Sequence, residues 1–314
     1  MQDTTPSQVI VACGRTVDID SPVVLWNHAG GFRCPHPRGR ASCHQHPAEL
    51  NDAPTQPFDA YRIADPDRAY EELTQTVHQL VLHYDVCYTS RHCHEVLQKS
   101  AFMGSHFYLD LDGTLYQTCD LYWKTNTAPA DDRKGNERAI HVEMANLSWQ
   151  ARAEESDLYR AEKDAYVKQG THWRLQLPQA YRNTLRTPGF VARPARTYGQ
   201  RGYFSRRVNG RMVRMWDFTE QQYEALIRLC FGVHALLPGI GLKVPFDKNT
   251  GRTPLSRLRN FATFRGILGH FHVQAGTTPG VKCKYDPGSA FDWGRVRRAL
   301  ETQQQTTRLG NASR

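Results

Sequence analysis

Two short apolar runs that each close on a histidine constrain the fold of this chain more than any other feature. They are Leu80–His83 and Ile267–His270. Runs of this length are typical of buried strands. A histidine that closes such a strand is carried to the edge of a sheet, where its side chain can face a cleft. The two runs therefore predict a sheet edge at which two imidazoles can meet.

Strands alternate with helices along the rest of the chain. The further strands predicted by the pattern are Val9–Val11, Val23–Trp26, His106–Asp110, Thr114–Gln117, Ala139–Met144, Tyr203–Val208 and Arg211–Met215. Asp112-Gly113 and Asn209-Gly210 are typical two-residue hairpin turns. Helices are predicted from Asp65 through Val77, from Cys93 to Lys99, from Phe218 to Leu237 with Thr219 as N-cap, and from Asp292 through Leu300. This order favours an α/β or α+β fold with a mixed central sheet.

The length of 314 residues is enough for one large domain or two smaller ones. We expect an N-terminal extension over residues 1–70, a main domain over residues 71–305 and a disordered tail over residues 306–314. Residues 147–215 are rich in arginine and tyrosine, and we interpret them as an insertion in the main domain. The predicted strands Tyr203–Val208 and Arg211–Met215 form an arginine-rich, basic hairpin at the end of this insertion.

The chain is basic, with 40 Lys and Arg against 31 Asp and Glu and a net charge of +9. Such a balance fits a polyanionic partner, namely nucleic acid, an anionic membrane surface or an acidic wall polymer. The alternative is that the arginine-rich runs at residues 182–214 and 295–298 are solvated faces. The sequence contains no run of 18 apolar residues, so it predicts no transmembrane helix. The N-terminus does not resemble a classical signal peptide, and the sequence indicates neither compartment nor oligomeric state.

A lysine and an aspartate follow the second histidine on a tight turn, Lys284-Tyr285-Asp286-Pro287-Gly288. Neutral imidazoles and a carboxylate bind zinc at roughly 2.0–2.2 Å. His83, His270 and Asp286 therefore form a candidate zinc site with one position open for water, whose pKa zinc lowers toward roughly 7. Because the chain has 14 histidines, the alternative for each is a surface or hydrogen-bonded residue. His272, on the same predicted strand face, competes with His270.

Five segments carry a resemblance to a known family: Leu80–His83, Ser105–Gln117, Ala139–Glu143, Gly269-His270 and Lys284–Trp293. In this order they resemble the type-2 N-acetylmuramoyl-L-alanine amidases, whose superfamily includes amidase-type phage lysozymes and peptidoglycan recognition proteins. The resemblance covers residues 70–146 and 216–300. It implies an α/β fold with a mixed, mainly parallel central β-sheet flanked by helices, and zinc in a surface groove.

The resemblance also implies roles for five residues. His83, His270 and Asp286 match the family's zinc ligands. Glu143 matches the residue beside the zinc water, which implies that it deprotonates this water and later protonates the leaving amine. Lys284 matches the lysine two residues before the third ligand, which implies oxyanion stabilisation alongside zinc. The alternatives are an exposed strand carboxylate paired with an arginine for Glu143 and a solvated turn lysine for Lys284.

The implied function is that of a hydrolase that uses Zn²⁺ and cleaves the amide between the lactyl group of N-acetylmuramic acid and L-alanine, in peptidoglycan or muropeptides. The alternative is a non-catalytic peptidoglycan-binding recognition module, although pure binders tend to lose a ligand. A third interpretation, a nucleic-acid-binding protein, rests only on the charge and the insertion. Because no recognised motif supports it, no nucleic-acid partner is expected.

Three features leave questions open. His141 stands where the family usually has a small residue, so the sequence does not define the groove there. Cys87 and Cys93 lie where many peptidoglycan recognition proteins carry a disulfide, and either a disulfide or two free buried thiols fits the sequence. Cys34 and Cys43 lie close to His36, His44 and His46, which indicates either a structural metal site or a surface loop.

Overall fold

The computed structural model describes residues 7–34, 63–100, 103–147 and 164–312. Its strands are β1 (Ser7–Ala12), β2 (Arg15–Leu25), β3 (Gln79–Tyr84), β4 (Phe107–Leu109), β5 (Leu115–Gln117), β6 (Ala139–Met144), β7 (Tyr166–Gln169), β8 (His172–Leu175), β9 (Phe204–Val208), β10 (Arg211–Met215) and β11 (Gly266–Gly269). Its helices are α1 (Pro66–Thr76), α2 (Ser90–Gln98), α3 (Gly135–Arg138), α5 (Glu220–Leu236), α6 (His270–Val273) and α7 (Trp293–Ala312), with short 3-10 turns at Gln179–Tyr181 and Gly199–Arg201.

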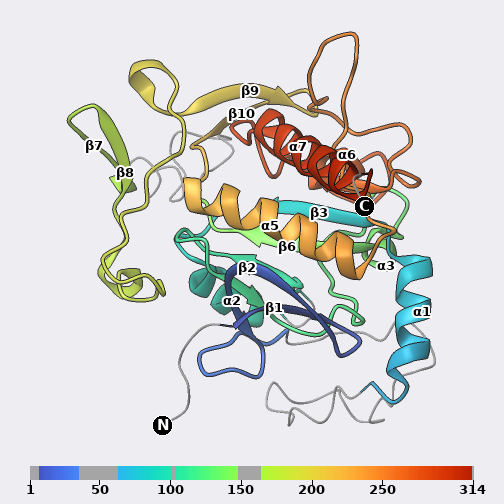
Figure 1. The fold of residues 1–314 in the computed structure, drawn as a ribbon. Helices are drawn as coiled ribbons and strands as arrows, with labels where there is room; N and C mark the ends of the chain where they lie inside the picture. The colour runs from blue at the N-terminus through green and yellow to red at the C-terminus, as the bar shows by residue number, and fades with distance from the viewer. Residues whose placement is uncertain (1–6, 35–62, 101–102, 148–163, 313–314) are drawn as a thin grey trace.

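Seven strands form one central sheet in the order β1-β2-β5-β4-β6-β3-β11 (Figure 1). The pairs β2–β5, β4–β6, β6–β3 and β3–β11 are parallel, whereas β1–β2 and β4–β5 are antiparallel. The predicted α/β fold with a mixed, mainly parallel sheet is confirmed. Two separate hairpins, β7–β8 and β9–β10, lie outside this sheet.

Side chains alternate along the strands, so both faces of the sheet carry apolar residues, and helices cover both faces. On β3 and β6, Leu80, Leu82 and Val142 enter the main core, which also contains the apolar side of α5. On the other face, Tyr108 and Tyr116 belong to a smaller cluster with residues of α2. The alternation predicted for Ala139–Met144 is therefore present.

The first two strands belong to the same sheet, although the sequence places them in an N-terminal extension. β2 pairs in parallel with β5, and β1 forms the outer edge. Helix α5 packs against β2 at Gly232, where a Cβ would lie 2.2 Å from Ile19 Cγ2. This close approach requires glycine at position 232. It allows α5 to pack directly on β2 and so joins the N-terminal strands to the core.

The local signals that the sequence offers are largely realised. Thr219 caps α5 by accepting a hydrogen bond from the Gln222 backbone N–H at 3.1 Å. Asn209 and Gly210 have φ values of 45° and 78°, and they join β9 to β10 as predicted. Helix α7 is longer than expected. It runs to Ala312, so its backbone continues beyond residue 305 into the region predicted to be disordered.

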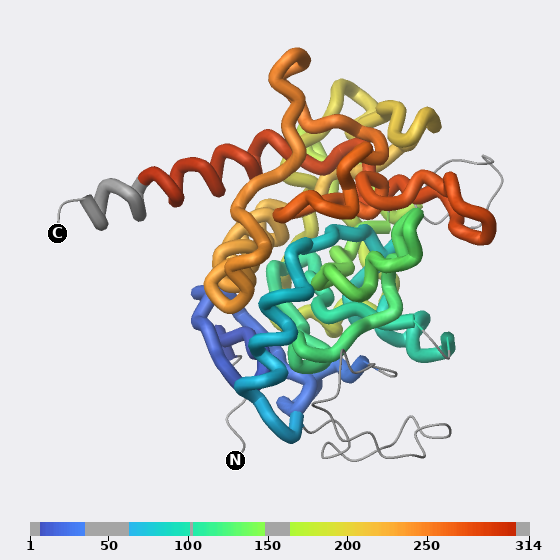
Figure 2. The backbone as a smooth tube through the Cα atoms, turned by 90° about the vertical axis from the view of Figure 1, so that its right-hand side faces the viewer, coloured from blue at the N-terminus to red at the C-terminus, as the bar shows by residue number. Residues whose placement is uncertain are grey.

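Figure 2 shows α7, in red, projecting from the body of the protein above β1 and β2, in blue. In the described parts of the chain, no helix is both long and apolar enough to cross a membrane.

Candidate metal and catalytic site

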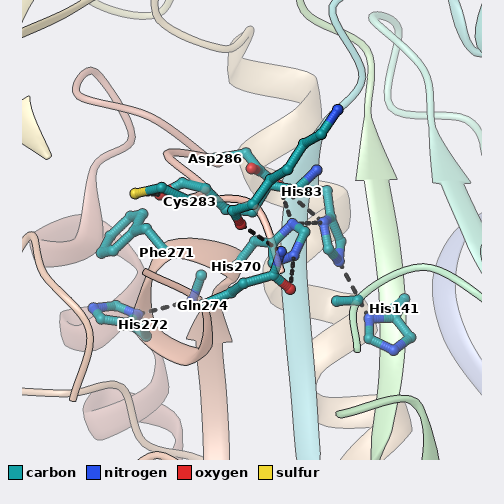
Figure 3. Close-up of polar contacts among 12 residues, drawn as sticks. His83, His141, His270, Phe271, His272, Gln274, Cys283 and Asp286 are labelled. Carbon is teal, nitrogen blue, oxygen red and sulfur yellow. Dashed lines mark hydrogen bonds and ion pairs between the residues drawn. The ribbon is translucent and has the colours of Figure 1, made fainter. Parts of the chain in front are cut away.

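Parallel pairing between β3 and β11 brings the two strand-end histidines together. Gly269 of β11 lies opposite Leu82 of β3, so His270 follows directly beside His83. Asp286 joins them from the loop before α7, and its backbone carbonyl accepts a hydrogen bond from the Phe271 N–H at 3.1 Å. Chain segments that are far apart in the sequence thus converge at one edge of the sheet (Figure 3).

The three predicted ligands present one atom each to a common point. His83 Nδ1 and His270 Nδ1 each lie 2.9 Å from Asp286 Oδ2, and the two nitrogens lie 3.0 Å apart. Ligand atoms at roughly 2.0–2.1 Å from a tetrahedral zinc ion lie about 3.3 Å apart. The observed triangle is slightly tighter than this, and both its shape and its donor set of two imidazoles and a carboxylate fit zinc.

Outer contacts orient both imidazoles so that Nδ1 faces this common point. His83 Nε2 lies 3.2 Å from His141 Nδ1, and His270 Nε2 lies 3.1 Å from Gln274 Oε1. When Nδ1 of a histidine binds a metal, the ring proton resides on Nε2 and needs an acceptor. His141 and Gln274 supply these acceptors.

Sequence reasoning did not identify Gln274. Its signal was the spacing of four residues from His270, which places the two side chains on one face of a helical turn. The predicted competitor, His272, is not on a strand. It lies in α6, accepts a hydrogen bond from the Gly269 N–H at Nδ1, and turns away from the ligand triangle (Figure 3).

Glu143 and Lys284 line the same cleft as the three predicted ligands, a cavity of about 430 Å³. Glu143 is the register partner of His83 on the neighbouring strand β6. Lys284 is half-buried, and its backbone is fixed by the hydrogen bond that its carbonyl accepts from Asn209 Nδ2 at 2.9 Å. The structure therefore brings all five predicted site residues to one cavity.

Burial and neighbouring charges set the protonation of these groups. Burial, and then the charge of His270, lower the pKa of His83 to about 4, so His83 is neutral at pH 7. Burial alone raises the pKa of Asp286, but His270 and His83 hold that pKa well below its usual range. A neutral imidazole and an ionised carboxylate are the forms that bind metals.

Glu143 has the opposite character. Burial, and then the charges of Asp286 and Asp85, raise the pKa of Glu143 well above its usual range, while Lys284 acts in the other direction. A carboxyl group in this setting keeps its proton to a higher pH than an exposed carboxyl group does. The cleft therefore combines an ionised carboxylate with one that readily takes up a proton.

A second group with metal-ligand side chains lies next to this cleft, formed by Asp85, Cys87 and Cys93. Both cysteines are free thiols in the structure. The hydrogen bond with Cys87, followed by burial, raises the pKa of Cys93 well above its usual value. Because thiolates rather than thiols bind metals, this group fits a metal less well than the histidine triangle does.

The predicted cysteine and histidine cluster around residues 34–46 lies outside the described residues, apart from Cys34. Cys34 is buried, and its thiol takes part in a hydrogen bond with Cys119.

Comparison with known proteins agrees with the resemblance noted in the sequence. Residues 73–185 match the profile of the N-acetylmuramoyl-L-alanine amidase family Amidase_2. This part of the chain is therefore similar to the family. The matched residues contain His83 and Glu143 and extend into the segment interpreted as an insertion, but they end before His270, Lys284 and Asp286. No curated protein sequence matches the chain.

Among solved structures, the chain is similar to a selenomethionine derivative of AmpD, at 14% identity over 87% of this chain and 95% of that one, with a TM-score of 0.37. It is also similar to the endolysin N-acetylmuramoyl-L-alanine amidase LysCS from Clostridium intestinale URNW, at 14% identity over 73% of this chain and 86% of that one, with a TM-score of 0.33. These values are too low for either structure to inform the function of this chain.

Proposed function

We propose that this chain is a zinc-dependent N-acetylmuramoyl-L-alanine amidase that hydrolyses the lactyl–L-alanine amide bond of peptidoglycan or muropeptides. The observation that carries this proposal is the triangle of donor atoms from His83, His270 and Asp286, in a cleft that Glu143 and Lys284 also line. The family match over residues 73–185 supports the reaction class.

His83, His270 and Asp286 would hold the zinc ion. When bound, zinc would supply Lewis-acid polarisation of the scissile carbonyl and increase the acidity of water in the cleft. Glu143 accepts a proton from the attacking water and returns it to the leaving amine, a role that its raised pKa favours. The Lys284 ammonium stabilises the negative charge that develops on the carbonyl oxygen of the substrate.

The test separates catalysis from binding. Glu143→Gln keeps the size of the side chain but removes its ability to accept a proton. We expect wild-type zinc content and a loss of muropeptide release on the order of 10²–10⁴-fold. Glu137→Gln is the matched control. Glu137 lies on α3, its carboxylate is exposed and pairs with Lys124 at 2.8 Å, and it does not line the cleft.

Normal turnover in Glu143→Gln would refute the catalytic role of this residue. Binding of peptidoglycan by the wild-type protein without any cleaved product would instead favour a non-catalytic recognition module. Muropeptide release followed by mass spectrometry, together with metal analysis of the same samples, distinguishes these outcomes.

A further inference from the structure

A second cavity, larger than the candidate catalytic cleft, lies beside the first turns of α7. Its volume is about 610 Å³, against about 430 Å³ for the cleft, and the two share no lining residue. Trp293, which lines the second cavity, has its ring edge beside Gly269, the residue before His270. The two cavities are therefore separate sites within one fold.

Three segments that are distant in the sequence bring arginines to this second cavity. We call it the arginine cavity and define it by the five arginines that line it: Arg196, Arg206, Arg252, Arg297 and Arg298. They come from the β9 hairpin with the loop before it, from the loop that follows α5, and from the first turns of α7. Asp292 is the one carboxylate among the lining residues.

Two of these arginines are neutralised within the protein. Arg196 pairs with Asp217 at 2.7 Å and with Asp292 at 2.9 Å, and Arg297 pairs with Glu301 at 2.9 Å. These pairs fix the walls of the cavity and leave its excess charge to the other three arginines.

The remaining arginines, Arg206, Arg252 and Arg298, form no ion pair within the described part of the chain. Three unpaired guanidinium groups around one concave space repel each other and focus a positive potential there. An anion that enters the cavity relieves this repulsion, and each guanidinium can donate a pair of hydrogen bonds to a phosphate or carboxylate group.

The first turn of α7 also lines the cavity, through Trp293 and Gly294. Gly294 leaves room for Arg298, whose Nη1 lies 3.2 Å from where a Cβ of residue 294 would be. The guanidinium thus lies close to the first turn of α7, where the helix dipole is positive.

We propose that the arginine cavity binds a ligand that carries at least two oxyanion groups, either phosphates or carboxylates. This site is independent of the proposed amidase chemistry, because it shares no lining residue with the cleft.

The test uses the full chain with pyrophosphate and citrate as probes in isothermal titration calorimetry. The triple variant Arg206→Gln, Arg252→Gln, Arg298→Gln removes the unpaired charges. A matched control, Arg15→Gln, Arg68→Gln, Arg228→Gln, lowers the net charge by the same amount at exposed ion-paired positions. We expect at least one probe to bind the wild type and to bind the triple variant about tenfold or more weakly, with little change in the control.

Binding of pyrophosphate alone identifies phosphate as the ligand chemistry, and binding of citrate alone identifies carboxylate. Equal weakening in both variants would show that only bulk charge matters, and no binding of either probe to the wild type would equally overturn the proposal. Muropeptide hydrolysis measured on the same samples should be unchanged in the triple variant. A failure of the amidase proposal is thereby distinguishable from a failure of this one. Thermal unfolding confirms that each variant is folded.

Discussion

His141 offers a sharp perturbation of the proposed metal site, because it touches a predicted ligand without being one. It is fully buried, and its Nδ1 lies 3.2 Å from Nε2 of His83. In the proposed zinc-bound form, the His83 ring proton lies on Nε2 and donates to His141. Replacing His141 with alanine removes this acceptor and lets the His83 ring rotate out of the ligand triangle.

The expected magnitude follows from the type of contact. Loss of an outer hydrogen-bond partner of a ligand typically weakens metal binding 10–100-fold, which corresponds to about 1.4–2.7 kcal/mol. Asparagine places its Oδ1 near the position of the histidine Nδ1, so His141→Asn should recover part of the loss. His94→Ala is the control for truncating a buried histidine, because His94 contacts the Arg33 carbonyl at 3.0 Å and does not line the cleft.

The assay is a zinc affinity measurement by competition with a chelator, on variants whose thermal unfolding shows that they are folded. We expect the zinc affinity to rank wild type first, then His141→Asn, then His141→Ala, with His94→Ala equal to wild type. A zinc affinity of His141→Ala equal to that of the wild type would refute the reasoning.

Two further predictions concern catalysis and stability. Lys284→Met should lower kcat on the order of 10²–10³-fold with zinc content unchanged, because the lost group acts on developing charge; a change in KM alone would contradict this. Burial and the charge of Asp112 raise the pKa of Asp110 to about 7 from its ordinary 3.8, so the folded state retains a proton that the unfolded state loses between these values. The free energy of unfolding should therefore fall by about 3 kcal/mol as pH rises from 4 to 7. Asp110→Asn should lack this component in denaturant titrations at several pH values, and an unchanged slope would count against it.

Much of the site could be predicted because alternation along strands is a local property. The pattern of Ala139–Met144 places Glu143 opposite its apolar neighbours, and the run Leu80–His83 ends in a histidine at the cleft. Hairpin and cap signals such as Asn209-Gly210 and Thr219 depend on a few adjacent residues, so they too are readable.

The rest depends on contacts between distant segments. The pairing of β2 with β5 and the packing of α5 on Ile19 follow from the tertiary core, and no local pattern in residues 7–25 indicates them. The chain changes from strand to helix directly at His270. The two-residue period of a strand therefore does not apply to His272, and the prediction that His272 lies on the same strand face as His270 is wrong. The same turn of helix gives His270 its partner Gln274.

The most direct test of the central claim is the metal content of the purified protein together with the mass of the products released from purified peptidoglycan. The proposal predicts one zinc ion per chain, and stem peptides that begin with a free L-alanine amine while the glycan strands stay intact. Removal of zinc by a chelator should abolish the release, and added zinc should restore it. Full activity in the zinc-free protein, or products that arise from cleavage of the glycan, would contradict the account.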